Sequence, residues 1–132
     1  MAVITTLMDW MLLVGRILLV VMFLLSGISK TIKFQDGLAE INAKHLPLPR
    51  IALVMTIVLQ MVASIMIVLG HYINFAATAL TLFTLATALV FYDFWNFRGN
   101  ERALLQTGFL EHISIIGGML LLIGAGPGTL IL

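Results

Sequence analysis

The stretch Gly15–Lys30, GRILLVVMFLLSGISK, decides how the rest of the chain is interpreted, because it is an apolar segment with a cation near each end. Thirteen uncharged residues, 17 to 29, separate Arg16 from Lys30. An α-helix covers this separation in about 21 Å, which is most of the thickness of a membrane's hydrocarbon core. The stretch is therefore predicted to cross a membrane with a basic side chain inside it.

The composition of the whole chain also indicates a membrane protein. Of its 132 residues, 61% are hydrophobic and 10% are charged, whereas soluble domains are about half apolar and one-quarter charged. The length and the apolar runs predict one domain covering residues 1–132. A net charge of +1, with no basic stripe between aromatic residues, argues against a nucleic-acid partner. Cysteine is absent, which excludes disulfides, thiol relays and iron–sulfur ligation by this chain.

Four apolar runs are long enough to cross a membrane, so we expect an all-α protein with its spans in an up-down-up-down bundle. Between the first two runs, Phe34, Leu38 and Ile41 recur at helical spacing and predict a short interfacial helix. The prolines of Leu46–Pro49 end that segment, and Gly126–Gly128 breaks the last helix. The predicted spans cover about residues 11–29, 51–69, 73–95 and 108–125.

Basic residues in the connections predict how the bundle is oriented. The segment 30–50 carries four lysines and arginines and the segment 95–109 carries two, while the 70–74 turn and both termini carry none. Connections rich in these residues stay in the cytoplasm. We therefore expect both charged connections to lie in the cytoplasm and both termini to lie outside it.

Arg16 and Gln60 are the candidate ligand-binding residues. Gln60 is predicted to lie about 7 to 8 Å deeper in the membrane than Arg16, within reach of its guanidinium if the two helices face each other. The five donors of a guanidinium require an anion or several carbonyls, and the only acid on its side of the membrane is Asp9. The alternative is that Arg16 extends outward to a lipid phosphate.

Lys30, Asp93 and Glu111 are the candidates for structural ion pairs, because all three fall at the predicted cytoplasmic side. An unpaired charge that is partly buried in a membrane protein is costly. We therefore expect Lys30 to form an ion pair with Asp93 or Glu111 that holds the helices of the bundle together. The alternative is that Lys30 extends to the surface. No two histidines have helical ligand spacing, so neither metal nor haem is expected, and His112 is expected to be a hydrogen-bonded structural residue.

Several short motifs, each weak alone, together resemble a DoxX-type membrane protein. They are GlyArg at 15–16, SerGlyIleSerLys at 26–30, LeuProLeuPro at 46–49, LeuGly at 69–70, PheTrp at 94–95, GlyGly at 117–118 and GlyProGly at 126–128. The family is similar in outline to the DoxD subunit of a thiosulfate:quinone oxidoreductase, and members have been linked to membrane redox complexes. The resemblance implies a protein of the bacterial cytoplasmic (inner) membrane, with a site within the bundle that contains Arg16, Lys30 and Gln60.

The leading hypothesis is a small redox-associated subunit whose bundle offers a pocket to a quinone or a small anion. Arg16 would contact the ligand, Gln60 would donate a hydrogen bond, and a partner subunit would carry the electrons, since no cofactor is expected within the chain. No self-contained catalytic site is evident, so whether the chain catalyses a reaction is left open. Transport is less favoured, because four spans give little room for alternating access.

The alternative hypothesis is a non-catalytic accessory subunit or assembly factor that binds other membrane subunits, or a second copy, through small residues. Small residues allow helices to approach closely in lipid. One candidate stripe runs along the third span, and Gly117 and Gly124 share a face of the fourth. If the stripe faces outward the interaction hypothesis is favoured, and if it faces inward the stripe holds the bundle together. The stripe consists of Ala77, Thr81, Thr84 and Ala88.

Overall fold

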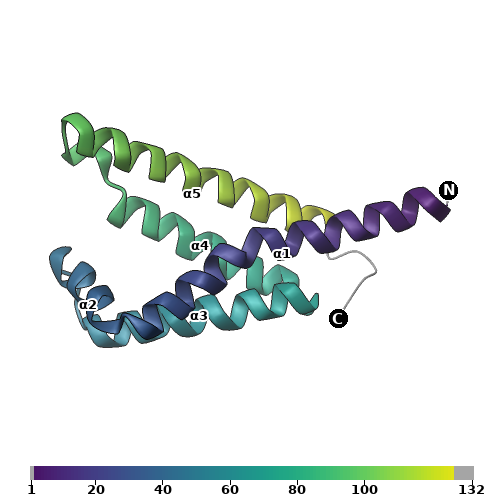
Figure 1. Cartoon of the computed structure of the whole chain (residues 1–132), viewed down its shortest axis with the longest axis horizontal. Coiled ribbons are helices and arrows are strands. Elements are labelled where there is room, and N and C mark those ends of the chain that lie inside the picture. Colours follow the sequence, from purple (N-terminus) through teal and green to yellow (C-terminus); the bar gives the residue numbers. More distant parts are fainter. Residues whose placement is uncertain (1, 127–132) are drawn as a thin grey trace.

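The computed structural model describes residues 2–126, and Figure 1 shows that they form long helices with short connections. The elements are α1 (Ala2–Ile32), α2 (Phe34–Ala43), α3 (Pro49–Leu69), α4 (Ile73–Phe91), the 3-10 helix η1 (Phe94–Asn96) and α5 (Gly99–Ala125). Of these, α1, α3, α4 and α5 are long and apolar enough to cross a membrane. The predicted all-α architecture with four spans is confirmed. Of the predicted break at Gly126–Gly128, only Gly126 lies within the described residues.

The ends of three spans differ from the prediction. The first helix begins at Ala2 instead of near residue 11, and α5 begins at Gly99 instead of near residue 108. The length of an apolar run marks the part of a helix that lies in lipid, and the same helix continues beyond it where no proline interrupts the backbone. In α5 this extension carries Glu101 in its first turn, where a carboxylate is favoured by the helix dipole. Conversely, α4 ends early, at Phe91, and Tyr92 leaves the helix.

The four spans follow one another around the bundle in chain order. Helix α1 packs on α3, α3 on α4 and α4 on α5, as an up-down-up-down arrangement requires. Contact between α1 and α5 is slight and includes Leu19 against Gly118, and within the described part of the chain α1 does not pack on α4. Figure 1 shows α4 and α5 diverging from α1 and α3 toward the end of the bundle that carries α2.

The two ends of the bundle differ in how tightly they are packed. We call the end that carries Lys30, α2 and Asp93 the charged end, and the end with the 70–72 turn the turn end. The main apolar core lies toward the turn end, where Val20, Ile67, Leu80 and Met119 are fully buried. Its tight packing fixes the spans against one another there and leaves them free to diverge at the charged end.

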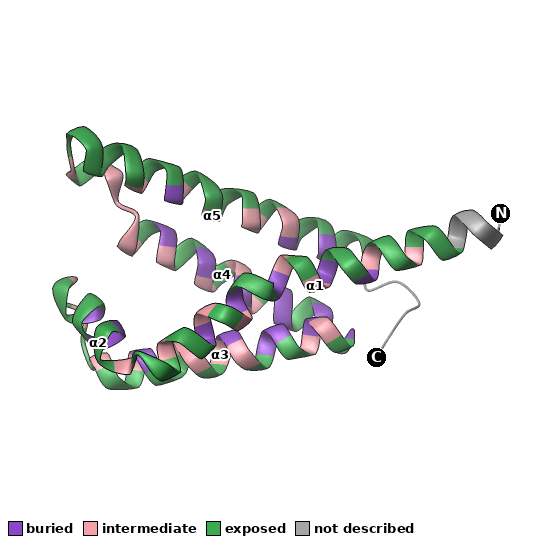
Figure 2. Cartoon of the chain, viewed as in Figure 1, coloured by how far each residue is buried: buried purple, intermediate pink, exposed green. Residues whose placement is uncertain are grey.

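The small-residue stripe of α4 faces the interior of the bundle. Ala77, Thr84 and Ala88 are buried, and Thr84 donates a hydrogen bond from Oγ1 to the Leu80 carbonyl oxygen. The stripe therefore holds the spans together. The outer surface is apolar and exposed, as Figure 2 shows over most of α5, and this is the surface that lipid covers.

Helix α2 packs under the bundle at the charged end. Its residues Leu38 and Ile41 are buried in a second apolar cluster with Leu53 of α3. Gly37 allows the close approach, because a Cβ atom there would lie 3.1 Å from the Leu53 methyl carbons. The predicted helix is confirmed, and it also covers one end of the space between the spans.

The contact between Gly108 of α5 and the Tyr92 ring gives a matched test of packing between α4 and α5. A Cβ atom at Gly108 would overlap the Tyr92 ring, whereas one at Gly117 on the same helix would meet nothing within 4 Å. We expect Gly108→Ala to lower the free energy of unfolding by about 1 to 3 kcal/mol through overpacking. Gly117→Ala should leave it unchanged or raise it by up to about 1 kcal/mol through helix propensity. Unfolding titrations in mixed micelles measure both, and equal effects would contradict the contact.

Candidate functional site

A cavity of about 290 Å³ lies between the spans at the charged end. By area its walls are mostly apolar, as is usual for a small-molecule site, although half of its eighteen lining residues are polar or charged. The polar residues around it are Ser26, Lys30, Glu40, Thr56, Gln60, Thr84, Thr87, Tyr92 and His112. Of the residues predicted to bind a ligand, Gln60 lines this cavity.

The Lys30 ammonium group is held at the cavity wall by two neutral oxygens. Lys30 Nζ donates to Ser26 Oγ at 2.6 Å, one helical turn back along α1, and to Gln60 Oε1 of α3 at 3.3 Å. Gln60 is only 3% exposed, so its amide is fixed between the helices. An ammonium carries three N–H donors, and these two bonds use two of them. The two hydrogen-bond partners of this cation are therefore uncharged, while the carboxylate of Glu40, which also lines the cavity, acts on it through its charge at longer range.

Asp93 forms an ion pair, but with a different partner from the one expected. Lys44 Nζ lies 2.8 Å from Asp93 Oδ1, Asn96 donates to Asp93 Oδ2 at 2.9 Å, and the Lys44 Nζ is also 5.6 Å from the centre of the Phe97 ring. Lys30 is not near this carboxylate because the halves of the bundle diverge at the charged end. The Lys44–Asp93 pair instead joins the segment after α2 to the segment after α4.

Glu111 is exposed on α5, and no ion pair within the described residues includes it. Within the described residues, Lys30 therefore forms no ion pair with Asp93 or Glu111, contrary to the expectation. Helix α5 turns the Glu111 carboxylate away from the cavity, while the next residue, His112, faces inward.

Arg16 lies inside the bundle near the turn end, away from the cavity. Its side chain is 1% exposed, and Nη2 donates to the Val68 carbonyl oxygen at 3.2 Å. Val68 is eight residues from Gln60, or about 12 Å along α3. The structure therefore does not bring Arg16 and Gln60 together. The Arg16 side chain is also buried within the bundle and does not extend outward to lipid, which was the alternative. A ligand contact at Arg16 stays a prediction.

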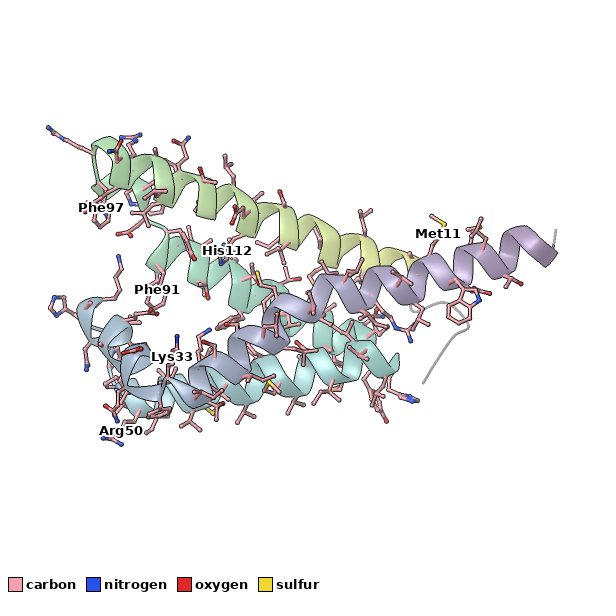
Figure 3. The ribbon with its side chains drawn as sticks, in the orientation of Figure 1. Met11, Lys33, Arg50, Phe91, Phe97 and His112 are labelled. Atoms are coloured by element: carbon pink, nitrogen blue, oxygen red, sulfur yellow. The ribbon has the colours of Figure 1, made fainter. Side chains whose placement is uncertain are left out.

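His112 is a cavity residue that the sequence did not single out for binding. Its Nδ1 lies 2.7 Å from the Gly108 carbonyl oxygen, and its ring centre lies 4.4 Å from that of Tyr92. Because a carbonyl only accepts, this bond places a proton on Nδ1, and Nε2 of the neutral ring is then an acceptor. Figure 3 shows His112 extending from α5 toward α4. The apolar pattern of the fourth span is too even to show which of its faces points inward.

Comparison with known proteins places the chain in a family. The model of the DoxX family matches residues 11–93, which is more than half of the chain. The chain belongs to the DoxX family. This confirms the resemblance carried by the short motifs, and the matched part contains Lys30, Gln60 and Asp93. Helix α5 and His112 lie beyond it.

Two relatives of the DoxX-family chain span nearly all of it. It is 30% identical over 120 residues to the inner membrane protein YphA of Escherichia coli, covering 91% of this chain and 86% of the relative. It is 27% identical over 121 residues to the ER-derived vesicles protein ERV29 of Saccharomyces cerevisiae, covering 92% of this chain but 32% of that protein. The chain thus spans about a third of the length of ERV29. No solved structure matches it.

The Lys44–Asp93 pair predicts a measurable coupling across the charged end. The two side chains are 25% and 15% exposed, so Lys44→Gln and Asp93→Asn should each lower the free energy of unfolding by about 1 to 2 kcal/mol. The double variant should lose little more than either single one, giving a coupling energy of about 1 kcal/mol in a double-mutant cycle. Glu111→Gln, which changes an exposed carboxylate in the middle of α5, is the control and should change stability by less than about 0.5 kcal/mol. Additive single effects would show that the pair does not join the two segments.

Proposed function

We propose that this protein is an inner-membrane subunit that binds the head group of a quinone, or a small anion, in the cavity beside Lys30 and Gln60. The observation that carries the proposal is the Lys30 ammonium, held at a mostly apolar cavity by two neutral acceptors. The name of the relative YphA supports the inner-membrane location. The distribution of lysine and arginine supports an orientation with the charged end in the cytoplasm and both termini outside.

The chemistry of the cavity favours a ligand with an acceptor oxygen. An ammonium group in an apolar place is costly unless its donors are satisfied, and a carbonyl or an anion satisfies the remaining N–H of Lys30. The apolar wall around it, including Phe23, Leu53 and Phe83, suits a flat ring better than a hydrated ion. His112, on a different helix, supplies an acceptor for the ring hydroxyl of the reduced form, the quinol, while Lys30 donates to an oxygen of either form. The quinone is therefore the favoured ligand and the small anion the second.

In this proposal the chain binds and orients the ligand, and a partner subunit carries the electrons. The chain contains no cysteine, so thiol or iron–sulfur relays would have to belong to the partner. The proposal keeps Gln60 as a ligand-site residue and adds Lys30 as the direct contact. Lys30 then acts as a binding residue, with Gln60 positioning its ammonium group.

A second candidate function is a non-catalytic accessory subunit. The inward stripe of α4 gives it no support, but the outer face of α5 does. Gly117 and Gly124 are exposed on this helix, and a Cβ atom added at either position would meet nothing within 4 Å. Helix α5 is also the least buried span, since 17% of the residues in its most apolar part are buried, against 28% in each of the other three spans. Small residues on a lipid-facing surface are where another membrane helix can approach closely. Native mass spectrometry of the gently solubilised protein distinguishes a retained small molecule from a retained subunit.

Replacing Lys30 tests the proposed ligand contact. We expect Lys30→Met to weaken the binding of labelled ubiquinone to the protein in nanodiscs by about 10- to 100-fold, because one hydrogen bond from a charged donor is lost. Lys33→Met, which removes an exposed lysine three residues away, is the matched control and should bind normally. Competition by a small oxyanion such as sulfate shows whether an anion occupies the same site.

Arg16→Leu separates this site from a ligand contact near the turn end. Because Arg16 does not line the cavity, the variant that inserts and folds should retain ubiquinone binding. Loss of binding in Arg16→Leu together with normal binding in Lys30→Met would move the site to Arg16 and would overturn the proposal.

A further inference from the structure

The cavity has a wall missing between α1 and α5. The spans pack in the order α1, α3, α4 and α5, and the ring they form is closed only by the slight contact that includes Leu19 and Gly118. From that contact toward the charged end, α1 and α5 diverge (Figure 1). The cavity lies in this diverging half, since its residues from α1 begin at Met22 and extend to Lys30. Only His112 represents α5 among its lining residues.

The residues beside this gap line the cavity and are also partly exposed at the outer surface of the bundle. Met22 lines the cavity and is 43% exposed, while Phe23, the next residue, is 2% exposed in the core. Lys30 and His112 also line the cavity and are half-buried. The gap therefore connects the polar end of the cavity to the surface that lipid covers.

The charged end of the cavity is lined by charged and apolar groups of α2 and the segment after it. Gly37, Glu40 and Ile41 of α2 line the cavity there, together with Leu46 of the following segment, and Glu40 is exposed. The ion pair of Lys44 and Asp93 crosses from that segment to the one after α4. A molecule that comes from the water at this end passes these charged groups, which disfavour an apolar chain and, at Glu40, repel an anion, whereas one that comes from the lipid meets apolar side chains such as Met22.

We infer that the ligand is a membrane-dissolved amphiphile with a long apolar chain, which enters sideways between α1 and α5. Its head group reaches Lys30 and Gln60, and its chain stays in the gap beside Met22, in contact with lipid. This inference rests on the proposed function and narrows it, because a chain-bearing quinone uses this route and a small water-soluble anion does not. The part of the bilayer that supplies the ligand is the leaflet next to the charged end.

A pair of introduced cysteines can close the gap. The helices α1 and α5 run in opposite directions and touch at Leu19 and Gly118, so Met22, three residues later, is level with Ile115, three residues earlier. The chain has no cysteine of its own, so a short bis-maleimide reacts only with the introduced pair. The test variant is Met22→Cys with Ile115→Cys, and the control is Leu19→Cys with Gly118→Cys, which is bridged by a direct disulfide because the helices already touch there.

The measurement is the rate at which long-chain ubiquinone binds to each protein in nanodiscs, before and after bridging. We expect bridging of the test pair to slow binding at least tenfold, and bridging of the control pair to change it less than twofold. If the bridged test variant binds as fast as the unbridged one, sideways access is overturned while the proposed function stands. If the unmodified protein binds no ubiquinone, the proposed function fails and the inference fails with it.

Discussion

The tight apolar core toward the turn end is the constraint on which the rest of the structure depends. Fully buried side chains such as Val20, Ile67 and Leu80 fix the four spans against one another there, where close packing tolerates little change in volume. Nothing equivalent joins all four spans at the charged end. That end is held by α2, which packs on α3, and by the ion pair between Lys44 and Asp93. A bundle fixed at one end and bridged at the other encloses a space, and that space is the cavity.

The position of Lys30 within this cavity has an energetic consequence. Bringing an ammonium group out of water is costly, and the usual remedy is a carboxylate partner, as Asp93 provides for Lys44. Lys30 instead donates to a serine hydroxyl and an amide oxygen, and the carboxylate of Glu40 acts on it only at longer range than an ion pair. An ammonium held directly against a carboxylate would attract an incoming oxygen weakly. Neutral hydrogen-bond partners keep the group in place and leave an N–H donor for a ligand, so the same arrangement that is poor for stability is suited to binding.

The sequence predicted the fold better than the site, for physical reasons. The number of spans follows from the length of the apolar runs, and α2 follows from the helical spacing of Phe34, Leu38 and Ile41. Both features could therefore be predicted from the sequence. The partners of Lys30 and Asp93 depend on register and on where a helix ends. The register of α1 against α3 is set by contacts such as that of Gly27 with Met61. Helix α4 ends at Phe91, and Asp93, in the segment that follows, then lies beside Lys44. Neither leaves a periodic signal in the sequence.

The division of the chain between matched and unmatched parts also bears on how the site is built. The stretch that matches the DoxX family supplies α1 to α4, and with them Lys30, Gln60 and the ion pair. The remaining wall comes from α5, which is the least buried span and is positioned mainly by its packing on α4. A change on the inward face of α5, around His112, therefore alters the gap and the far side of the cavity without disturbing the ammonium end. In such an arrangement the width of the access route can vary through α5 while the head-group contact is kept, because Lys30 and Gln60 belong to α1 and α3.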